Sequence, residues 1–317
     1  SAASDVYKRQ IEVFIMKWFF LSIVALLCWS FSDLFSKIGC ADSKDKHSAL
    51  KMVTAVGVVM GLHAAYTLIF TDVEFSFRTM LTYLPVSFLY ISSMTIGYVG
   101  LRFIELSISS PICNSSGTLA SIISIITGMA VLVKAQYIAI ALVAVGIVGL
   151  SIAEMTEDDD LRAARQSKSN YKYTKSILAI LLPIIYCLLD ALGSFADSLV
   201  LEKLDEDAAN TSYELTFLIC GILCFIYVKF IKKDKFFPKK EAPKYIGAAF
   251  ETAGQFAYIY AIADKDHFAL SAPIISAYCA ASVLWGRIFL KEKLSWKHYL
   301  CILLTVAGIV IMGVYDG

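Results

Sequence analysis

The chain has 317 residues, of which 58% are hydrophobic and 17% are charged, and its formal net charge at pH 7 is +1. A soluble domain is about 45–50% apolar and about 25% charged, so this composition excludes a soluble globular protein and indicates an integral membrane protein. The near-neutral net charge says nothing about nucleic acid, but the lack of a basic soluble segment with interleaved aromatic residues argues against a nucleic-acid partner.

Residues 1–15 carry no initiator methionine, whereas Met16 stands directly before the first apolar run. We expect this leader to be non-native or disordered and to take no part in the fold. Ten apolar segments follow, each close to the roughly 20 residues that a helix needs to cross a bilayer. They lie at 18–38, 51–70, 80–101, 107–132, 136–154, 176–199, 212–231, 245–263, 268–290 and 298–315. They are too long for barrel strands and do not alternate, so an all-α integral membrane protein with ten transmembrane helices is predicted.

A polar, charged stretch at 155–175 separates five segments from the other five and is interpreted as a linker. The two halves resemble each other, because residues 83–152 align without a gap on residues 245–314 at a constant shift of 162. Since five is an odd number, two halves with the same fold must be inverted relative to each other in the membrane. The prediction is therefore two inverted five-helix repeats, at 16–154 and 176–317.

The first helix of each half extends this likeness. The run from Trp29 to Asp33 resembles the run from Gly193 to Asp197, at a shift of 164, although so short a match also arises by chance. A membrane protein built from two copies of one hydrophobic unit is most often a transporter, because matched halves can rock around a site between them.

Lys and Arg residues are unequally divided between the two ends of the predicted helices. The loops after the odd-numbered segments, with their flanks, hold 21 of the 28, and the other side holds 7. The positive-inside rule places the richer side in the cytoplasm, and both termini outside, in a plasma or inner membrane. The lipid bilayer is thus an expected partner, while the sequence leaves the oligomeric state open.

Acidic residues fall inside several segments. An ionisable side chain costs roughly 2.5–3.5 kcal/mol at the centre of a membrane helix, so it usually faces a cavity. Asp190 lies near the middle of its segment, with Tyr186 and Ser194 four residues to either side and Asp197 seven residues on, all on one helical face. This face is either a wall that binds a cation, an amine or a proton, or a polar stripe for helix packing, with Asp197 at the membrane surface.

Glu251, Gln255 and Tyr258 recur at helical spacing in the eighth segment, where no Lys or Arg neutralises the glutamate. A lone intramembrane glutamate suits a proton carrier. The alternative is a glutamate that is hydrogen-bonded to a neighbouring helix. Asp33 follows Trp29 by one turn in the first segment, and either lines a cavity or pairs with Lys37.

Hydroxyl, amide and aromatic side chains recur in three more segments. The third carries Tyr90 and Tyr98, the fourth carries Asn114 and Thr118 after Pro111, and the ninth carries Tyr278 and Ser282 after Pro273. Proline near the start of paired helices leaves backbone carbonyls free for polar contacts at the midplane. The alternative is that these small polar residues mediate ordinary close packing of helices.

A family resemblance rests on the second half. The run from Ala272 to Ile275, the Lys291–Ser295 hairpin with its glutamate, and the closing run from Ala307 to Val310 resemble the drug/metabolite transporter superfamily, EamA type. The resemblance spans residues 17 to 315 and implies ten helices in two inverted fives around a cavity lined from segments 1, 3, 4, 6, 8 and 9. Two features depart from that family: the first-repeat hairpin at 130–134 has no glutamate, and the family's termini are usually cytoplasmic.

The resulting hypothesis is a secondary transporter that moves a small metabolite, or an amphiphilic or amine-bearing organic solute, by alternating access. A proton, an exchanged solute or the solute gradient would drive it, since no phosphate-binding loop is present. The alternatives are a membrane-embedded enzyme and a non-transporting scaffold or sensor. Scattered histidines without a catalytic motif argue against an enzyme, and eight cysteines without a CxxC pair argue against a metal or cofactor site.

Overall fold

The computed structural model describes residues 17–40, 45–100, 106–156, 177–289 and 293–315. The expected leader at 1–15, the linker from 157 on, and residues 290–292 of the glutamate hairpin lie outside these ranges. The described residues form helices and contain no strand. Eight of the helices are long and apolar enough to cross a membrane, so the predicted all-α integral membrane fold is confirmed.

The helices of the first half are α2 (Lys17–Cys40), α3 (Ser48–Phe70), α4 (Phe77–Gly100), α5 (Leu106–Asn114), α6 (Ser116–Ile126) and α7 (Lys134–Met155). Those of the second half are α9 (Ile177–Val200), α10 (Glu206–Ile226), α11 (Pro238–Ile262), α12 (Phe268–Ser276), α13 (Tyr278–Phe289) and α14 (Trp296–Val314). A π-helical turn, Tyr227–Ile231, continues α10.

Two helices begin well before the apolar segments that predicted them. The start of α10 lies at Glu206 instead of 212, because the Asp205 side chain caps the helix by accepting the Ala208 N–H at 2.9 Å. The start of α11 lies at Pro238 instead of 245, with proline in the first turn, where its missing N–H costs nothing. Polar first turns thus carry both helices beyond their apolar segments.

The sequence predicted that the fourth and ninth segments are each one continuous helix. In the structure, each of them is broken near the middle. The breaks fall at Ser115, between α5 and α6, and at Ala277, between α12 and α13, and these positions differ by the same 162 residues that relate the two halves. Each break comes four residues after a proline, whose missing N–H leaves unpaired the carbonyl four residues before the proline.

The carbonyl that a proline frees is used for packing in the ninth segment. Pro273 cannot donate to the Ala269 carbonyl four residues earlier, and that oxygen accepts the Ser121 hydroxyl of α6 at 2.9 Å. The freed carbonyl therefore ties α12 to α6 and does not point to a ligand.

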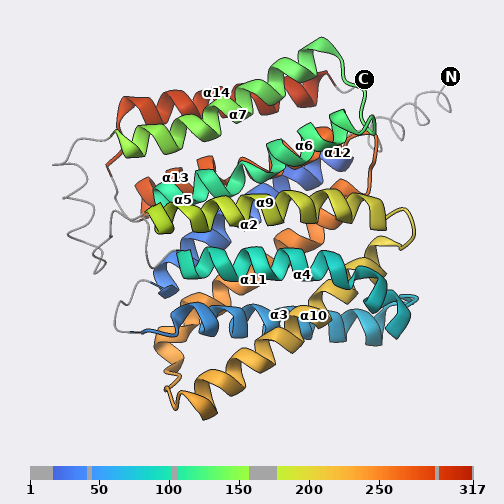
Figure 1. The fold of residues 1–317 in the computed structure, drawn as a ribbon, viewed down its shortest axis with the longest axis vertical. Helices are drawn as coiled ribbons and strands as arrows, with labels where there is room; N and C mark the ends of the chain where they lie inside the picture. Colours follow the sequence, from blue (N-terminus) through green and yellow to red (C-terminus); the bar gives the residue numbers. More distant parts are fainter. Residues whose placement is uncertain (1–16, 41–44, 101–105, 157–176, 290–292, 316–317) are drawn as a thin grey trace, which may run out of the picture.

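The packing of the helices follows a two-fold pattern (Figure 1). The most extensive pairs are α2 with α11, α4 with α9, α3 with α10, and α7 with α14. The counterparts in the two halves are α2 and α9, α3 and α10, α4 and α11, and α7 and α14. Exchanging each helix for its counterpart turns the α2–α11 pair into the α9–α4 pair and leaves the α3–α10 and α7–α14 pairs unchanged. The chain enters α2 on the right of Figure 1 and α9 on the left. The two halves therefore run in opposite directions, as an inverted repeat requires.

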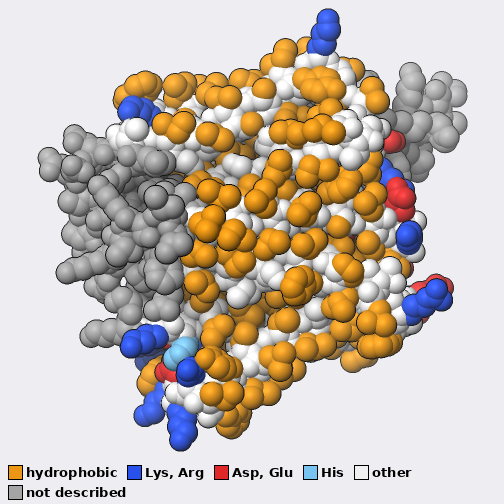
Figure 2. All heavy atoms as spheres, in the orientation of Figure 1, with side chains coloured by type: hydrophobic (Ala, Val, Ile, Leu, Met, Phe, Trp, Pro, Cys, Tyr) orange, Lys and Arg blue, Asp and Glu red, His pale blue; other side chains and the backbone are white. Residues whose placement is uncertain are grey.

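Glycines allow the paired helices to approach closely. A Cβ on Gly57 of α3 would lie 2.7 Å from the Phe217 carbonyl of α10, and one on Gly308 of α14 would lie 2.7 Å from the Ala139 carbonyl of α7. Such contacts between small residues are how helices associate in lipid. Large apolar side chains instead face outward, and Figure 2 shows them as a broad band between charged ends. This surface suits a bilayer.

Candidate functional site

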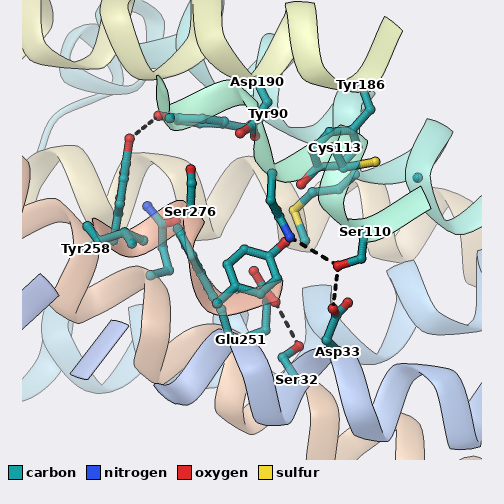
Figure 3. Close-up of a pocket in the computed structure, with 18 of the residues that line it drawn as sticks. Ser32, Asp33, Tyr90, Ser110, Cys113, Tyr186, Asp190, Glu251, Tyr258 and Ser276 are labelled. Carbon is teal, nitrogen blue, oxygen red and sulfur yellow. Dashed lines mark hydrogen bonds between the residues drawn. The ribbon is translucent and has the colours of Figure 1, made fainter. Parts of the chain in front are cut away.

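A cavity of about 110 Å³ lies between the two halves, where the broken helices cross. It is lined from α2, α4, α5, α9, α11 and α12, with single residues of α6, α10 and α13. Three of its lining residues are acidic, namely Asp33, Asp190 and Glu251, and among the residues that the structure describes none of the lining is Lys, Arg or His. The cavity is therefore an acidic chamber (Figure 3).

Two of the carboxylates accept hydrogen bonds from hydroxyl groups (Figure 3). The Ser110 hydroxyl donates to Asp33 Oδ2 at 3.0 Å and is itself an acceptor from the Asn114 amide at 3.1 Å. The Ser32 hydroxyl donates to Glu251 Oε2 at 2.8 Å. Asp33 thus lines the cavity.

Asp190 of α9 lies next to the beginning of α6. Its Oδ2 accepts the Ser116 hydroxyl at 2.7 Å, and its Oδ1 is 3.5 Å from the Ser93 hydroxyl of α4. Ser116 is the first residue of α6, where unpaired backbone N–H groups and the helix dipole favour negative charge. The break in the fourth segment therefore builds part of the environment that stabilises this carboxylate.

Aromatic side chains form much of the remaining wall. They are Trp29, Tyr90, Tyr98, Tyr186, Tyr213, Tyr258 and Tyr278. The Trp29 ring lies 5.1 Å from that of Tyr258 and 5.9 Å from that of Tyr278, centroid to centroid, and packs over Gly254, where any Cβ would collide with it. Aromatic faces beside carboxylates are typical of sites for organic cations.

One amide in the wall has no protein partner. Gln255 is only 3% exposed, and its Nε2 makes no hydrogen bond to any residue that the structure describes. A buried donor left unpaired costs roughly 1–3 kcal/mol. A bound solute with an acceptor group would recover that cost.

A group of hydroxyls adjoins the cavity on the side of α4 and α9. The Tyr90 hydroxyl lies 3.2 Å from the Ser194 hydroxyl and 3.4 Å from Asp197 Oδ2, and it also hydrogen-bonds the Tyr258 hydroxyl. Asp197 accepts a further bond from the Tyr83 hydroxyl at 2.8 Å and is fully buried. Asp197 is thus next to the cavity but behind its wall.

The structure brings together twelve of the fifteen residues that the sequence singled out. They are Trp29, Asp33, Tyr90, Tyr98, Asn114, Tyr186, Asp190, Ser194, Glu251, Gln255, Tyr258 and Tyr278. Thr118, Asp197 and Ser282 do not line the cavity. Asp197 also lies fully buried, whereas one interpretation of its helix had placed it at the membrane surface.

The break at Ser115 explains why Thr118 is misplaced. On a continuous helix Thr118 would share a face with Asn114, but the helix restarts at Ser116 and Thr118 does not reach the cavity. Ser282 of α13 instead approaches the Ser30 carbonyl of α2, at 3.5 Å, in a packing contact.

Several lining residues were not predicted. Ser32, Ser110 and Ser276 are small polar residues on apolar helices, and serine alone does not separate packing from binding. Ser110 could have been found as the residue one turn before Asn114. Tyr213 lies in the first turns of α10, where the predicted segment had only begun, so no stripe marked it.

An ionic cluster lies outside the cavity, where α2, α3 and α11 meet. Lys51 Nζ is 3.1 Å from Asp45 and 3.3 Å from Asp234, and Lys244 Nζ is 2.7 Å from Glu241 Oε2. Lys51 and Lys244 are 4% and 2% exposed. The His47 ring, 3.0 Å from Asp234, lowers the pKa of that loop carboxyl by hydrogen bonding. This cluster joins the α2–α3 loop to the α10–α11 loop.

Residues 177–314, which form the second half of the fold, match the sequence model of the EamA-like transporter family. The second half of the chain is thus similar to the EamA-like transporters of the drug/metabolite transporter superfamily. A solved crystal structure, titled only as that of a protein, resembles 93% of this chain and 95% of its own, with a TM-score of 0.66 at 13% identity. That likeness concerns the fold alone. No curated protein matches the chain.

Proposed function

We propose that the protein is a secondary active transporter of a small amine-bearing or cationic organic solute, which it moves by alternating access. The observation that carries this proposal is the cavity wall, which has three carboxylates, seven aromatic rings and no basic side chain among the described residues that line it. Acidic groups in a low-dielectric site attract positive charge strongly. An ammonium group would supply the charge that the wall lacks.

The arrangement of the wall suits an organic cation better than a bare metal ion. Asp33, Asp190 and Glu251 already accept hydrogen bonds from serine hydroxyls, which fix them on different helices around the chamber. The rings of Trp29 and Tyr258 add apolar area and cation–π attraction. A solute with a charged nitrogen and an apolar body would satisfy both kinds of group.

The match of the second half to the EamA-like transporter family favours transport over the enzyme alternative. The scaffold or sensor alternative makes a different prediction, because such a protein would tolerate neutralisation of the three cavity acids. Coupling to a proton, to an exchanged solute, or to the solute gradient alone is compatible with the fold.

A thermal-shift screen of the purified protein tests the proposal. The compounds are amino acids, polyamines, quaternary amines, nucleobases and sugars, each at two pH values, since a bound compound stabilises the folded form by mass action. We expect stabilisation by amines. We also expect Asp190→Asn and Glu251→Gln to weaken binding about tenfold or more, because a hydrogen bond to a charged group contributes roughly 1.5–3 kcal/mol.

The matched control is Glu202→Gln, which neutralises a carboxylate in a surface ion pair with Lys265, far from the cavity wall. It should leave the amine response unchanged. Stabilisation by neutral sugars or nucleobases alone, unaffected by either cavity variant, would contradict the proposal. The acids would then serve packing or coupling, and the Ser, Asn and Tyr side chains would form the binding site.

A further inference from the structure

Asp197 is a buried carboxylate that the proposed binding of cargo does not use. It is 0% exposed and accepts hydrogen bonds from Tyr83 and Tyr90, both on α4. Among the residues that the structure describes, no Lys, Arg or His makes a salt bridge to it. A charge buried without a partner is costly, so this site favours a carboxyl group that can take up a proton.

The site is connected to the cavity. The Tyr90 hydroxyl, which lines the cavity, lies within hydrogen-bonding reach of Asp197, of Ser194 and of the Tyr258 hydroxyl. These groups form a short relay from the chamber to Asp197. Ser87 lies between Tyr83 and Tyr90 on the same face of α4, and its buried hydroxyl has no partner within the described part of the chain.

The inverted repeat gives Asp197 a counterpart in the first half. Asp33 occupies the corresponding place in α2 at the shift of 164 that relates Trp29 to Gly193. Asp33 lines the cavity, whereas Asp197 is sealed behind tyrosines. In an inverted-repeat transporter the second state exchanges the conformations of the two halves, so Asp197 should then become accessible.

We propose that Asp197 is the proton site that couples transport to a pH gradient, separate from the cargo site at Asp33, Asp190 and Glu251. This inference rests on the proposed transport function. The step is a simple one: the carboxylate takes one proton to become a carboxylic acid in one state and returns it in the other, and no bond of the cargo changes. Because the cargo cannot reach Asp197, proton and cargo can be bound together.

Other titratable groups must be separated from Asp197 in any pH experiment. Tyr83 and Tyr90 face it from α4, and Tyr258 of α11 and Tyr213 of α10 lie just beyond them. Neither α5 nor α6 contributes an Asp, Glu, Lys, Arg or His to it. The cavity acids Asp33, Asp190 and Glu251 are rival sources of a pH response. The intramembrane pair of His63 and Glu214, 2.8 Å apart between α3 and α10, is another.

Two readouts test the inference, and the first needs no cargo. Infrared difference spectra of the reconstituted full chain, recorded between neutral and acidic pH, should contain a carboxylic acid C=O band that Asp197→Asn removes. Tyr83→Phe, which keeps the carboxyl but removes a donor, should shift that band. Ser198→Ala, at the next buried position, whose hydroxyl bonds only its own helix at Phe195, is the control that should leave it in place.

The second readout uses radiolabelled tetraethylammonium in proteoliposomes. Asp197→Asn should retain exchange of external for internal tetraethylammonium, but lose at least tenfold of the uptake driven by an imposed pH gradient. An infrared band that survives Asp197→Asn, or gradient-driven uptake that survives it, overturns the inference, and a band lost only in Glu214→Gln or Glu251→Gln assigns the response to that carboxyl group. If the unmodified protein moves no tetraethylammonium, the transport proposal fails for that solute while the infrared result still decides the proton site.

Discussion

Gly117 lies where the two broken helices cross, and no other residue fits there. A Cβ at this position would overlap the Ser276 hydroxyl and the Ala272 carbonyl oxygen of α12. The carbonyl belongs to the backbone and cannot rotate away, so the helices would have to separate. We expect Gly117→Ala to destabilise the fold by about 1–3 kcal/mol, which is the usual cost of overpacking. Its denaturation midpoint in detergent measures this effect.

Gly100→Ala is the matched control for that measurement. Gly100 is also a buried helical glycine, but an added Cβ would lie 3.7 Å from Leu182 Cβ, an ordinary van der Waals contact. Alanine also has the better helix propensity, so this variant should be as stable as the original protein or slightly more stable. Equal midpoints for the two variants would show that the crossing at Gly117 is looser than the structure indicates.

At the scale of single residues, the sequence could predict the acids of the cavity and most of its aromatics, but only Ser194 among its serines. Asp190 and Glu251 stand out because charge inside a bilayer is costly and rare. Ser32 and Ser110 do not stand out, since serine is common wherever membrane helices pack. Thr118 was wrongly placed because helical spacing assumes a continuous helix, and the break at Ser115 is visible only in three dimensions.

At the scale of elements, Lys244 holds the beginning of α11 against α2. Its stem packs over Gly39, and its ammonium group lies 2.7 Å from Glu241 Oε2, with both side chains almost fully buried. Lys244→Met keeps most of the stem but leaves Glu241 with the more distant Lys51, at 3.8 Å. Because breaking a buried pair leaves an uncompensated charge, we expect a loss of about 3 kcal/mol in the free energy of unfolding.

Lys239→Met provides the comparison, because Lys239 also lies near the beginning of α11 but its side chain is exposed. Surface substitutions of this kind usually change stability by no more than about 0.5 kcal/mol. Chemical denaturation of both variants under one detergent condition measures the difference. A loss below about 1 kcal/mol for Lys244→Met would mean that Lys51 and water compensate Glu241.

Among the elements, the eight described helices that are long and apolar enough to cross a membrane were predictable, because hydrophobic length is a strong signal. The ends of the helices were less predictable, because α10 and α11 begin with polar turns that hydropathy does not detect. A capping aspartate at 205 extends α10. The breaks at Ser115 and Ala277 were not predicted, although a proline precedes each by four residues. Many membrane helices contain proline without breaking, as α4 and α9 do here, so proline alone is a weak sign.

At the scale of the whole molecule, the constant shift of 162 residues has a direct structural counterpart. It relates the two breaks to each other, and it relates Gly146 to Gly308, which both lie in the contact between α7 and α14. Two-fold symmetry explains this correspondence. Where a helix packs against its own counterpart, equivalent residues of the two helices meet equivalent neighbours. The cavity departs from that symmetry where Asp33 is open and Asp197 is sealed, as expected of one state of an alternating cycle.

The inverted repeat alone does not fix the orientation of the molecule in the membrane, because two inverted halves can be placed either way round. The orientation must therefore be measured. With 21 of 28 Lys and Arg residues at the end that includes the linker, we expect that end to be cytoplasmic and both termini external. A fluorescent reporter that matures only in the cytoplasm should stay dark after residue 317 and become bright when inserted near residue 165. Moving positive charge to the other end, by substituting lysine at several exposed loop positions between 71 and 76, should weaken this preference. A bright C-terminal fusion with a dark linker insertion would reverse the orientation, and the end of the cavity facing the cytoplasm with it.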